Sequence, residues 1–109
     1  MSYKIVNTPE AAKEIKRLFK KYASLKDELI QLNNILQKNP FQGTPLGNNL
    51  FKIRLSIKSK GTGKRSGARI ITFIRIIENE VLILSIYDKA DQANITMEEI
   101  KKRIKNFLF

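Results

Sequence analysis

The 109-residue sequence contains no cysteine, no histidine and no tryptophan. Without cysteine the chain has no disulfides, no thiol nucleophile and no thiolate metal site. Without histidine it has neither a Ser-His-Asp triad nor an imidazole ligand for a metal. Any catalysis therefore has to use lysine, arginine, tyrosine or a carboxylate, and we expect neither a metal nor another cofactor.

Long hydrophobic segments are also missing. The longest apolar runs, 70–74 and 81–86, have the length of a β-strand, whereas a membrane-spanning helix needs about 20 apolar residues. The first residues lack the apolar core of a signal peptide. A chain of 109 residues has the usual length of one domain. We therefore expect a single cytoplasmic domain over residues 1–109, with no membrane partner.

Acidic residues are few, and the basic residues are unevenly distributed. The 21 Lys and Arg against 10 Asp and Glu give a formal charge of +11. Between Lys52 and Arg69 stand seven cationic residues and no acidic one. A surface that only keeps a protein soluble mixes both signs, whereas a segregated positive segment attracts polyanions. We therefore predict a nucleic-acid site in this segment.

Periodicity and capping signals predict the secondary structure. A short strand is expected over 3–7, followed by a helix that begins at Thr8-Pro9-Glu10 and a second helix with a capping box at Ser24. Strict alternation over 51–58 predicts a strand with one apolar and one cationic face. A β-hairpin over 68–87 turns at 78–80, and a capping box at Thr96 begins the last helix.

This order of elements predicts an α+β domain with a mainly antiparallel four-stranded sheet. The N-terminal helical hairpin and the C-terminal helix are expected to pack on one face of that sheet. Segment 41–49 contains glycine, proline and asparagine, and we expect it to be a loop.

Three further groups of residues have simpler explanations than catalysis. The glycine-rich basic segment 61–67 lacks the spacing of a nucleotide-binding loop, so it either lays cations along a phosphate backbone or is a flexible connection. Asp88 and Asp91 are expected to be turn residues. Glu98 and Glu99 suit the positive start of a helix.

The most informative group consists of four cations and a tyrosine on or next to three predicted strands. If these strands are neighbours, their side chains converge at one end of the sheet and suit RNA, and we expect them to be exposed. The group comprises Lys52, Arg54, Arg69, Tyr87 and Lys89. Metal-free RNA cleavage needs a base for the 2′-OH, a cation for the phosphorane and an acid for the 5′-oxygen.

A lysine crowded by cations has a lowered pKa and can be the base, whereas arginine can only stabilise or position. The tyrosine ring can stack on a nucleobase. The alternative is a binding face without chemistry, in which the tyrosine is a half-buried strand residue. RNA binding is expected to extend to Lys58, Lys60, Lys64 and Arg65.

These features together resemble a toxin of the RelE/ParE superfamily, nearest to its HigB-like branch. The residues that carry the resemblance are the early Tyr-Lys-Ile-Val, the helical hairpin, 51–55 (Phe-Lys-Ile-Arg-Leu), 61–71 (Gly-Thr-Gly-Lys-Arg-Ser-Gly-Ala-Arg-Ile-Ile), 86–89 (Ile-Tyr-Asp-Lys) and 94–96 (Asn-Ile-Thr). In the loop, Ser66 replaces a usual glycine. The resemblance implies a bacterial type II toxin–antitoxin module. RelE and HigB members cleave mRNA on the ribosome, whereas ParE members poison DNA gyrase.

The resemblance also implies roles for individual residues. Lys52 and Arg54 match two basic strand positions that RelE uses for acid–base and phosphate contacts, and Arg69 matches its transition-state arginine. Lys89 falls near a further basic position. The stacking tyrosine of RelE falls at Ile95, so we expect Tyr87 to take its place from the neighbouring strand end.

A ribosome-dependent mRNA endoribonuclease (an mRNA interferase that inhibits translation) is thus the leading hypothesis. The expected partners are the ribosome, mRNA and a small DNA-binding antitoxin. The alternatives are a gyrase-directed toxin and a non-catalytic member that only binds RNA or its antitoxin.

Overall fold

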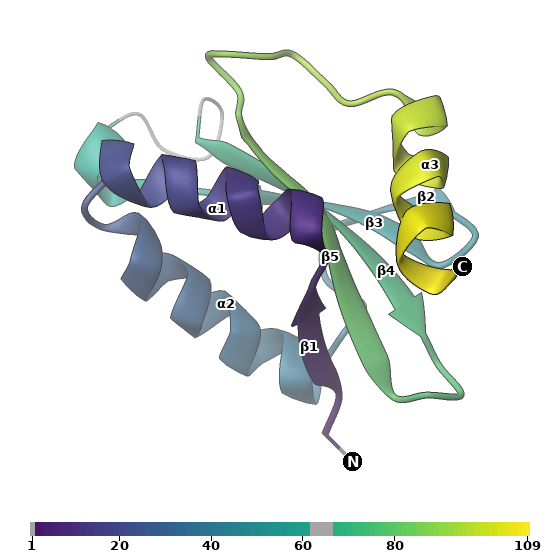
Figure 1. Ribbon diagram of the computed structural model, residues 1–109. Coiled ribbons are helices and arrows are strands. Elements are labelled where there is room, and N and C mark those ends of the chain that lie inside the picture. The colour runs from purple at the N-terminus through teal and green to yellow at the C-terminus, as the bar shows by residue number, and fades with distance from the viewer. Residues whose placement is uncertain (1, 62–66) are drawn as a thin grey trace.

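The computed structural model describes residues 2–61 and 67–109. In chain order its elements are β1 (Lys4–Asn7), α1 (Pro9–Lys21), α2 (Leu25–Lys38), β2 (Thr44–Gly47), β3 (Leu50–Leu55), the 3₁₀ helix η1 (Lys58–Lys60), β4 (Ala68–Arg75), β5 (Glu80–Asp88) and α3 (Met97–Leu108). The chain thus forms three α-helices on one mixed sheet (Figure 1), which confirms the predicted α+β class. No helix in the described part of the chain is long and apolar enough to cross a membrane.

The sheet has five strands in the order β1-β5-β4-β3-β2. β1 runs parallel to β5, and the other neighbours are antiparallel. Four of these strands were predicted, and β2 lies where we expected a loop. The missed signal is the Asn48-Asn49 pair, whose φ angles of 53° and 64° form a two-residue turn between β2 and β3. This hairpin places Gly43 against the backbone of Lys52.

The helices cover both faces of the sheet, so the prediction that they share one face is wrong. α1 and α2 pack over a cluster that includes Ile53, Ile70 and Ile83. α3 packs on the opposite face, over a cluster that includes Leu82 and Leu84, as Figure 1 shows. The reason lies in β5, where consecutive apolar residues are buried on both faces instead of alternating with polar ones.

The helix starts follow their capping signals with one exception. Thr8 Oγ1 accepts a hydrogen bond from Ala11 N (3.2 Å), and Thr96 Oγ1 accepts one from Glu99 N (3.1 Å). Ser24 makes no side-chain cap, because its hydroxyl donates to Glu28 instead (3.1 Å). The other oxygen of Glu28 accepts a hydrogen bond from the backbone of Lys58 (2.6 Å), so the start of α2 is tied to the segment after β3.

Candidate active site

The strand register brings the predicted cations together. Arg54 of β3 lies opposite Arg69 of β4, which in turn lies opposite Tyr87 of β5. Residues directly opposite one another point to the same face of a sheet, and Lys52 shares that face because it precedes Arg54 by two positions. The three strands are therefore neighbours, as the prediction of a convergent site requires.

The Lys52 amine is held by the side-chain amide of Asn94, which lies in the segment between β5 and α3. Lys52 Nζ donates to Asn94 Oδ1 (3.2 Å), and the same oxygen accepts the hydroxyl of Tyr87 (3.3 Å). Partial burial lowers the pKa of Lys52, and the charges of Lys89, Arg69 and Arg54 lower it further. Lys52 thus gives up its proton more readily than an ordinary lysine, as a general base requires.

Arg69 is buried, whereas we expected an exposed strand cation. Only 5% of the residue is exposed, and its Nη1 donates to the carbonyl oxygen of Ala68 (3.2 Å). The reason is that β4 is an inner strand of the sheet, with neighbours on both sides. Arg69 therefore lies buried next to the more exposed Lys52 and Arg54 of the neighbouring strand β3.

The expected stacking role of Tyr87 does not fit the structure. The residue is 1% exposed and belongs to the cluster beneath α3, together with Ile95 and Ile100. A nucleobase has no access to a ring in that position. Burial raises the pKa of Tyr87, although the charge of Arg69 opposes the change, so the phenol stays protonated at neutral pH.

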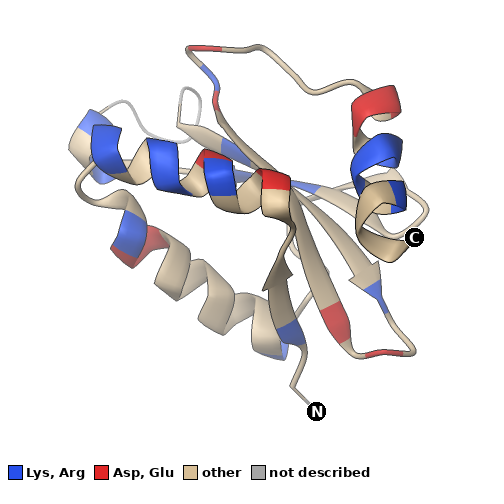
Figure 2. Ribbon diagram, viewed as in Figure 1, with Lys and Arg blue, Asp and Glu red and all other residues tan. Residues whose placement is uncertain are grey.

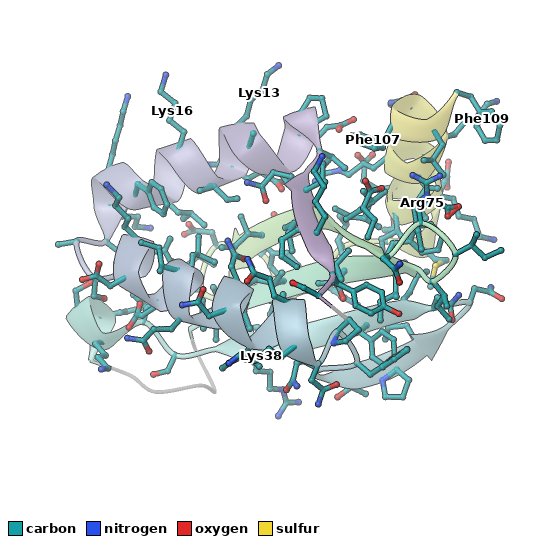
Figure 3. All side chains as sticks on the ribbon, turned by 90° about the horizontal axis from the view of Figure 1, so that it is seen from below. Lys13, Lys16, Lys38, Arg75, Phe107 and Phe109 are labelled. Atoms are coloured by element: carbon teal, nitrogen blue, oxygen red, sulfur yellow. The ribbon has the colours of Figure 1, made fainter. Side chains whose placement is uncertain are left out.

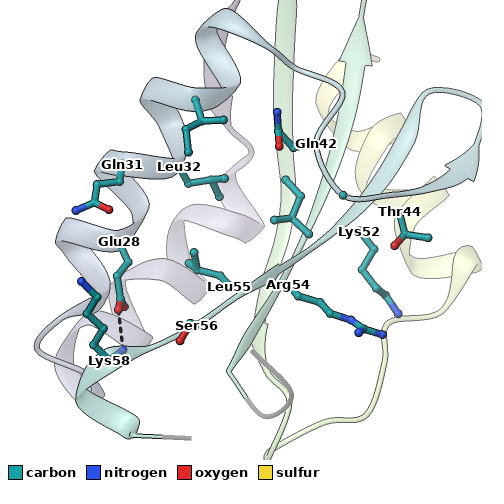
Figure 4. A pocket seen from close by; sticks show the side chains of 13 residues that line it. Glu28, Gln31, Leu32, Gln42, Thr44, Lys52, Arg54, Leu55, Ser56 and Lys58 are labelled. Carbon is teal, nitrogen blue, oxygen red and sulfur yellow. Dashed lines mark hydrogen bonds between the residues drawn. The ribbon is translucent and has the colours of Figure 1, made fainter. Parts of the chain in front are cut away.

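Arg54 and Lys89 are the exposed cations of the site. Lys89 Nζ donates to the carbonyl oxygen of Ala93 (3.0 Å), and the Lys89 backbone N–H donates to Gly67 (3.0 Å). Figure 4 shows Lys52 and Arg54 extending from β3 in the same direction, away from α2. Both side chains therefore present their charged ends to the same region.

A cavity of about 500 Å³ lies between β3 and α2, and its lining includes Glu28 and Leu32 of α2 as well as Lys52 and Arg54 of β3 (Figure 4). The charged ends of Lys52 and Arg54 point away from its α2 wall. The cavity and the cluster of cations therefore adjoin each other at β3.

Lys60 is bound to an acid rather than free to contact RNA. Its Nζ lies 2.5 Å from Oδ1 of Asp88, whose other carboxylate oxygen accepts the hydroxyl of Tyr22. Burial disfavours the charged carboxylate, but the hydrogen bonds from Lys60 and Tyr22 outweigh it and lower the pKa of Asp88 to about 2. Asp88 also accepts the backbone N–H of Ala90 (3.0 Å), as a turn residue does.

The other predicted RNA contacts are only partly described. Lys58 is exposed, at the start of η1. Lys64 and Arg65 lie outside the described residues. Within residues 2–61 and 67–109, no three His, Cys, Asp or Glu side chains are grouped as ligands for a metal ion.

Comparison with known proteins identifies the family. A family model described as the RelE toxin of the RelE/RelB toxin–antitoxin system matches residues 9–106. The chain belongs to the RelE toxin family. No sequence among curated proteins matches it. The predicted resemblance to the RelE/ParE superfamily is thereby confirmed.

Two solved structures of Escherichia coli RelE share the fold. A free-state double mutant, in which two arginines are replaced by alanine, aligns with a TM-score of 0.67 and 18% identity over 99% of this chain and 100% of that one. The isolated toxin in a P21 crystal form aligns with a TM-score of 0.62 and 16% identity over 98% of this chain and 100% of that one. The family match makes this chain a toxin of a toxin–antitoxin system, and the family implies an antitoxin partner.

Sequence reasoning missed Asn94 and the pairing of Asp88. Asn94 contacts Lys52 from 42 residues away in the chain, and Asp88 contacts Lys60 from 28 residues away. Neither pair has a local spacing signal, because helical and strand periodicities relate only residues within one element.

Proposed function

We propose that this toxin is a metal-independent endoribonuclease that cleaves mRNA on translating ribosomes and so inhibits translation. The observation that carries the proposal is the convergence of Lys52, Arg54 and Arg69 on one sheet face, with a pKa of Lys52 lowered by burial and by those neighbours. The charged side chains of this group are cations, which attract a phosphate backbone and repel a divalent metal.

The chemistry follows from the positions of these groups. The neutral Lys52 amine takes the proton of a 2′-OH, and the resulting oxygen attacks the adjacent phosphorus. The new P–O2′ bond replaces the P–O5′ bond, leaving a 2′,3′-cyclic phosphate and a 5′-oxygen. Arg69 and Arg54 stabilise the negative charge of the phosphorane. Lys89, whose positive charge also lowers the pKa of Lys52, protonates the leaving 5′-oxygen.

Dependence on the ribosome follows from what the site lacks. Without histidine, the proposed proton carriers of the site are lysines. Correct placement of the RNA by the ribosome therefore has to supply much of the rate of cleavage. The outer face of α1 carries further cations, and Figure 3 shows Lys13 and Lys16 extending from it into solvent. Figure 2 shows Lys and Arg, drawn in blue, on α1 as well as on β3. Such a surface attracts the RNA of the ribosome.

The antitoxin is proposed to be a small DNA-binding protein with an acidic or amphipathic segment. A net charge of +11 on the toxin favours an acidic partner segment. The complex should therefore weaken as salt is raised. Purification of the toxin together with the product of an adjacent reading frame, at low and high salt, tests this partner.

Induced expression followed by primer extension tests the endoribonuclease. We expect cuts at codon positions in translated mRNA and little cleavage of the same RNA without ribosomes, and Lys52→Ala should strongly weaken the cuts. Growth arrest with intact messages would overturn the proposal. Intact mRNA with DNA damage would instead select a gyrase-directed toxin, and full tolerance of expression would select a non-catalytic member.

A further inference from the structure

We propose that Asn94 is a positioning residue that holds the Lys52 amine in the orientation needed to take a proton from RNA. This inference rests on the endoribonuclease function proposed above. Asn94 lies in the segment between β5 and α3 and is exposed, so it has no role in filling the core. Its amide oxygen reaches into the cluster of cations.

The contacts of Asn94 make a rigid support for a flexible side chain. Its Oδ1 accepts from both Lys52 Nζ (3.2 Å) and the hydroxyl of Tyr87 (3.3 Å). Tyr87 is 1% exposed and packed in the apolar cluster beneath α3. Ile95, which follows Asn94 in the chain, is buried in the same cluster. The amide is therefore held from two sides, and the four-carbon stem of Lys52 loses its freedom at the place where the amine is needed.

This contact gives the buried Tyr87 a structural role in place of stacking on a nucleobase. Its ring has no access to a nucleobase, but its hydroxyl orients the Asn94 oxygen that holds Lys52. This chain of contacts connects the core beneath α3 to the amine on β3.

An amide suits this position better than a carboxylate would. The groups that face Lys52 are Lys89, Arg69 and Arg54, and Tyr87 shares its partner. A neutral amide oxygen accepts a hydrogen bond without adding a negative charge. It therefore orients the amine while leaving it able to release a proton, and a neutral amine still has one lone pair free for the 2′-OH. A carboxylate at the same place would favour the charged ammonium.

Two substitutions separate positioning from a merely structural contact. Asn94→Asp keeps the shape of the side chain and adds a charge, so it should raise the pKa of Lys52 by about one unit or more. Asn94→Ala removes the support without adding charge. Asn34→Asp is the matched control, because Asn34 is exposed on α2 and the net charge changes equally.

The experiment combines a titration with a rate measurement on the full chain. The ¹³Cε shift of Lys52 is followed against pH by NMR, and single-turnover cleavage of mRNA on programmed ribosomes is measured over the same pH range. Asn94→Asp should raise the pKa of Lys52 and move the cleavage profile to higher pH by the same amount. Asn94→Ala should slow cleavage about tenfold or more with unchanged ribosome binding, and Asn34→Asp should match the wild type.

The outcomes distinguish this inference from the proposed function. A wild-type toxin that cleaves no ribosome-bound mRNA overturns the function itself. If the wild type cleaves and Asn94→Ala cleaves equally fast, only the role of Asn94 is overturned. The same holds if Asn94→Asp slows cleavage without changing the pKa of Lys52 or the pH profile.

Discussion

The ammonium group of Lys60 lies 2.5 Å from Oδ1 of Asp88, so a cation of the positive segment is neutralised by an acid at the end of β5. The Asp88 side chain is 1% exposed, and the hydroxyl of Tyr22 from the end of α1 reaches its other oxygen. This carboxylate therefore joins three segments that are distant in the chain. It stabilises the strand end that carries Lys89 next to the candidate site.

The first prediction concerns the pH dependence of stability. The pKa of Asp88 is lowered from 3.8 to about 2, so the folded state retains the charged carboxylate at pH values where the unfolded chain is protonated. The stabilisation is complete above about pH 4 and is lost as the pH falls toward 2, with a magnitude of about 2 kcal/mol. Urea unfolding of the wild type and Asp88→Asn between pH 2 and 7 measures it.

Asp88→Asn should lower the free energy of unfolding at pH 7 by about 3 kcal/mol, because it leaves Lys60 without its buried partner charge. Asp91→Asn is the control. Asp91 pairs with Lys21 at an exposed position, so its loss should change stability little. Equal stability of wild type and Asp88→Asn at pH 7 would contradict the role of this carboxylate.

The second prediction concerns Arg69. Arg69→Lys should slow single-turnover cleavage on programmed ribosomes about a hundredfold, because a lysine ammonium is a compact point charge that does not reproduce the planar, oriented guanidinium. Because Arg69 is buried, Arg69→Ala should also lower the melting temperature by several degrees. Full cleavage by a folded Arg69→Ala protein would exclude the proposed site.

The third prediction separates the base from the phosphate contacts. Lys52→Ala should flatten the pH dependence of cleavage. Arg54→Ala should lower the rate and keep a pH-dependent profile, moved slightly to higher pH because the charge of Arg54 helps to lower the pKa of Lys52. Circular dichroism melts show whether both variants stay folded. An unchanged pH profile in Lys52→Ala would assign the base to another residue.

The fourth prediction contrasts two neighbouring lysines. Lys58 is exposed, so Lys58→Ala should leave stability unchanged and reduce the salt dependence of ribosome binding by about one unit of slope. Lys60 is paired with Asp88, so Lys60→Ala should mainly destabilise the fold. Binding titrations at several salt concentrations and thermal melts of both variants decide between these roles. The reverse result would mean that the pair opens on the ribosome.

The fifth prediction concerns the close approach of Gly43 to β3. A Cβ at Gly43 would lie 2.4 Å from the carbonyl oxygen of Lys52, so Gly43→Ala should displace the strand that carries Lys52. We expect lower stability and slower cleavage. Gly47→Ala is the control, because Gly47 has a similar φ of +91° but open space around it. Equal effects of the two substitutions would show that backbone strain alone is responsible.

Much of this protein can be predicted from short-range patterns. The caps at Thr8 and Thr96 and the helical hairpin depend on residues within a few positions of one another, and the structure confirms them. The alternation predicted a strand over 51–58, and the structure confirms it only as far as Leu55, where β3 ends. The same alternation places Lys52 and Arg54 on one face of β3, because successive side chains of a strand point to opposite sides.

Tertiary packing decided what covers each residue. The burial of Arg69 and Tyr87, the Lys60–Asp88 pair and the support of Lys52 by Asn94 all arise between segments far apart in the chain. Local periodicity determines the face of an element on which a residue lies. It contains no information about the helix, strand or loop that packs over that face, because that depends on long-range contacts of the whole chain.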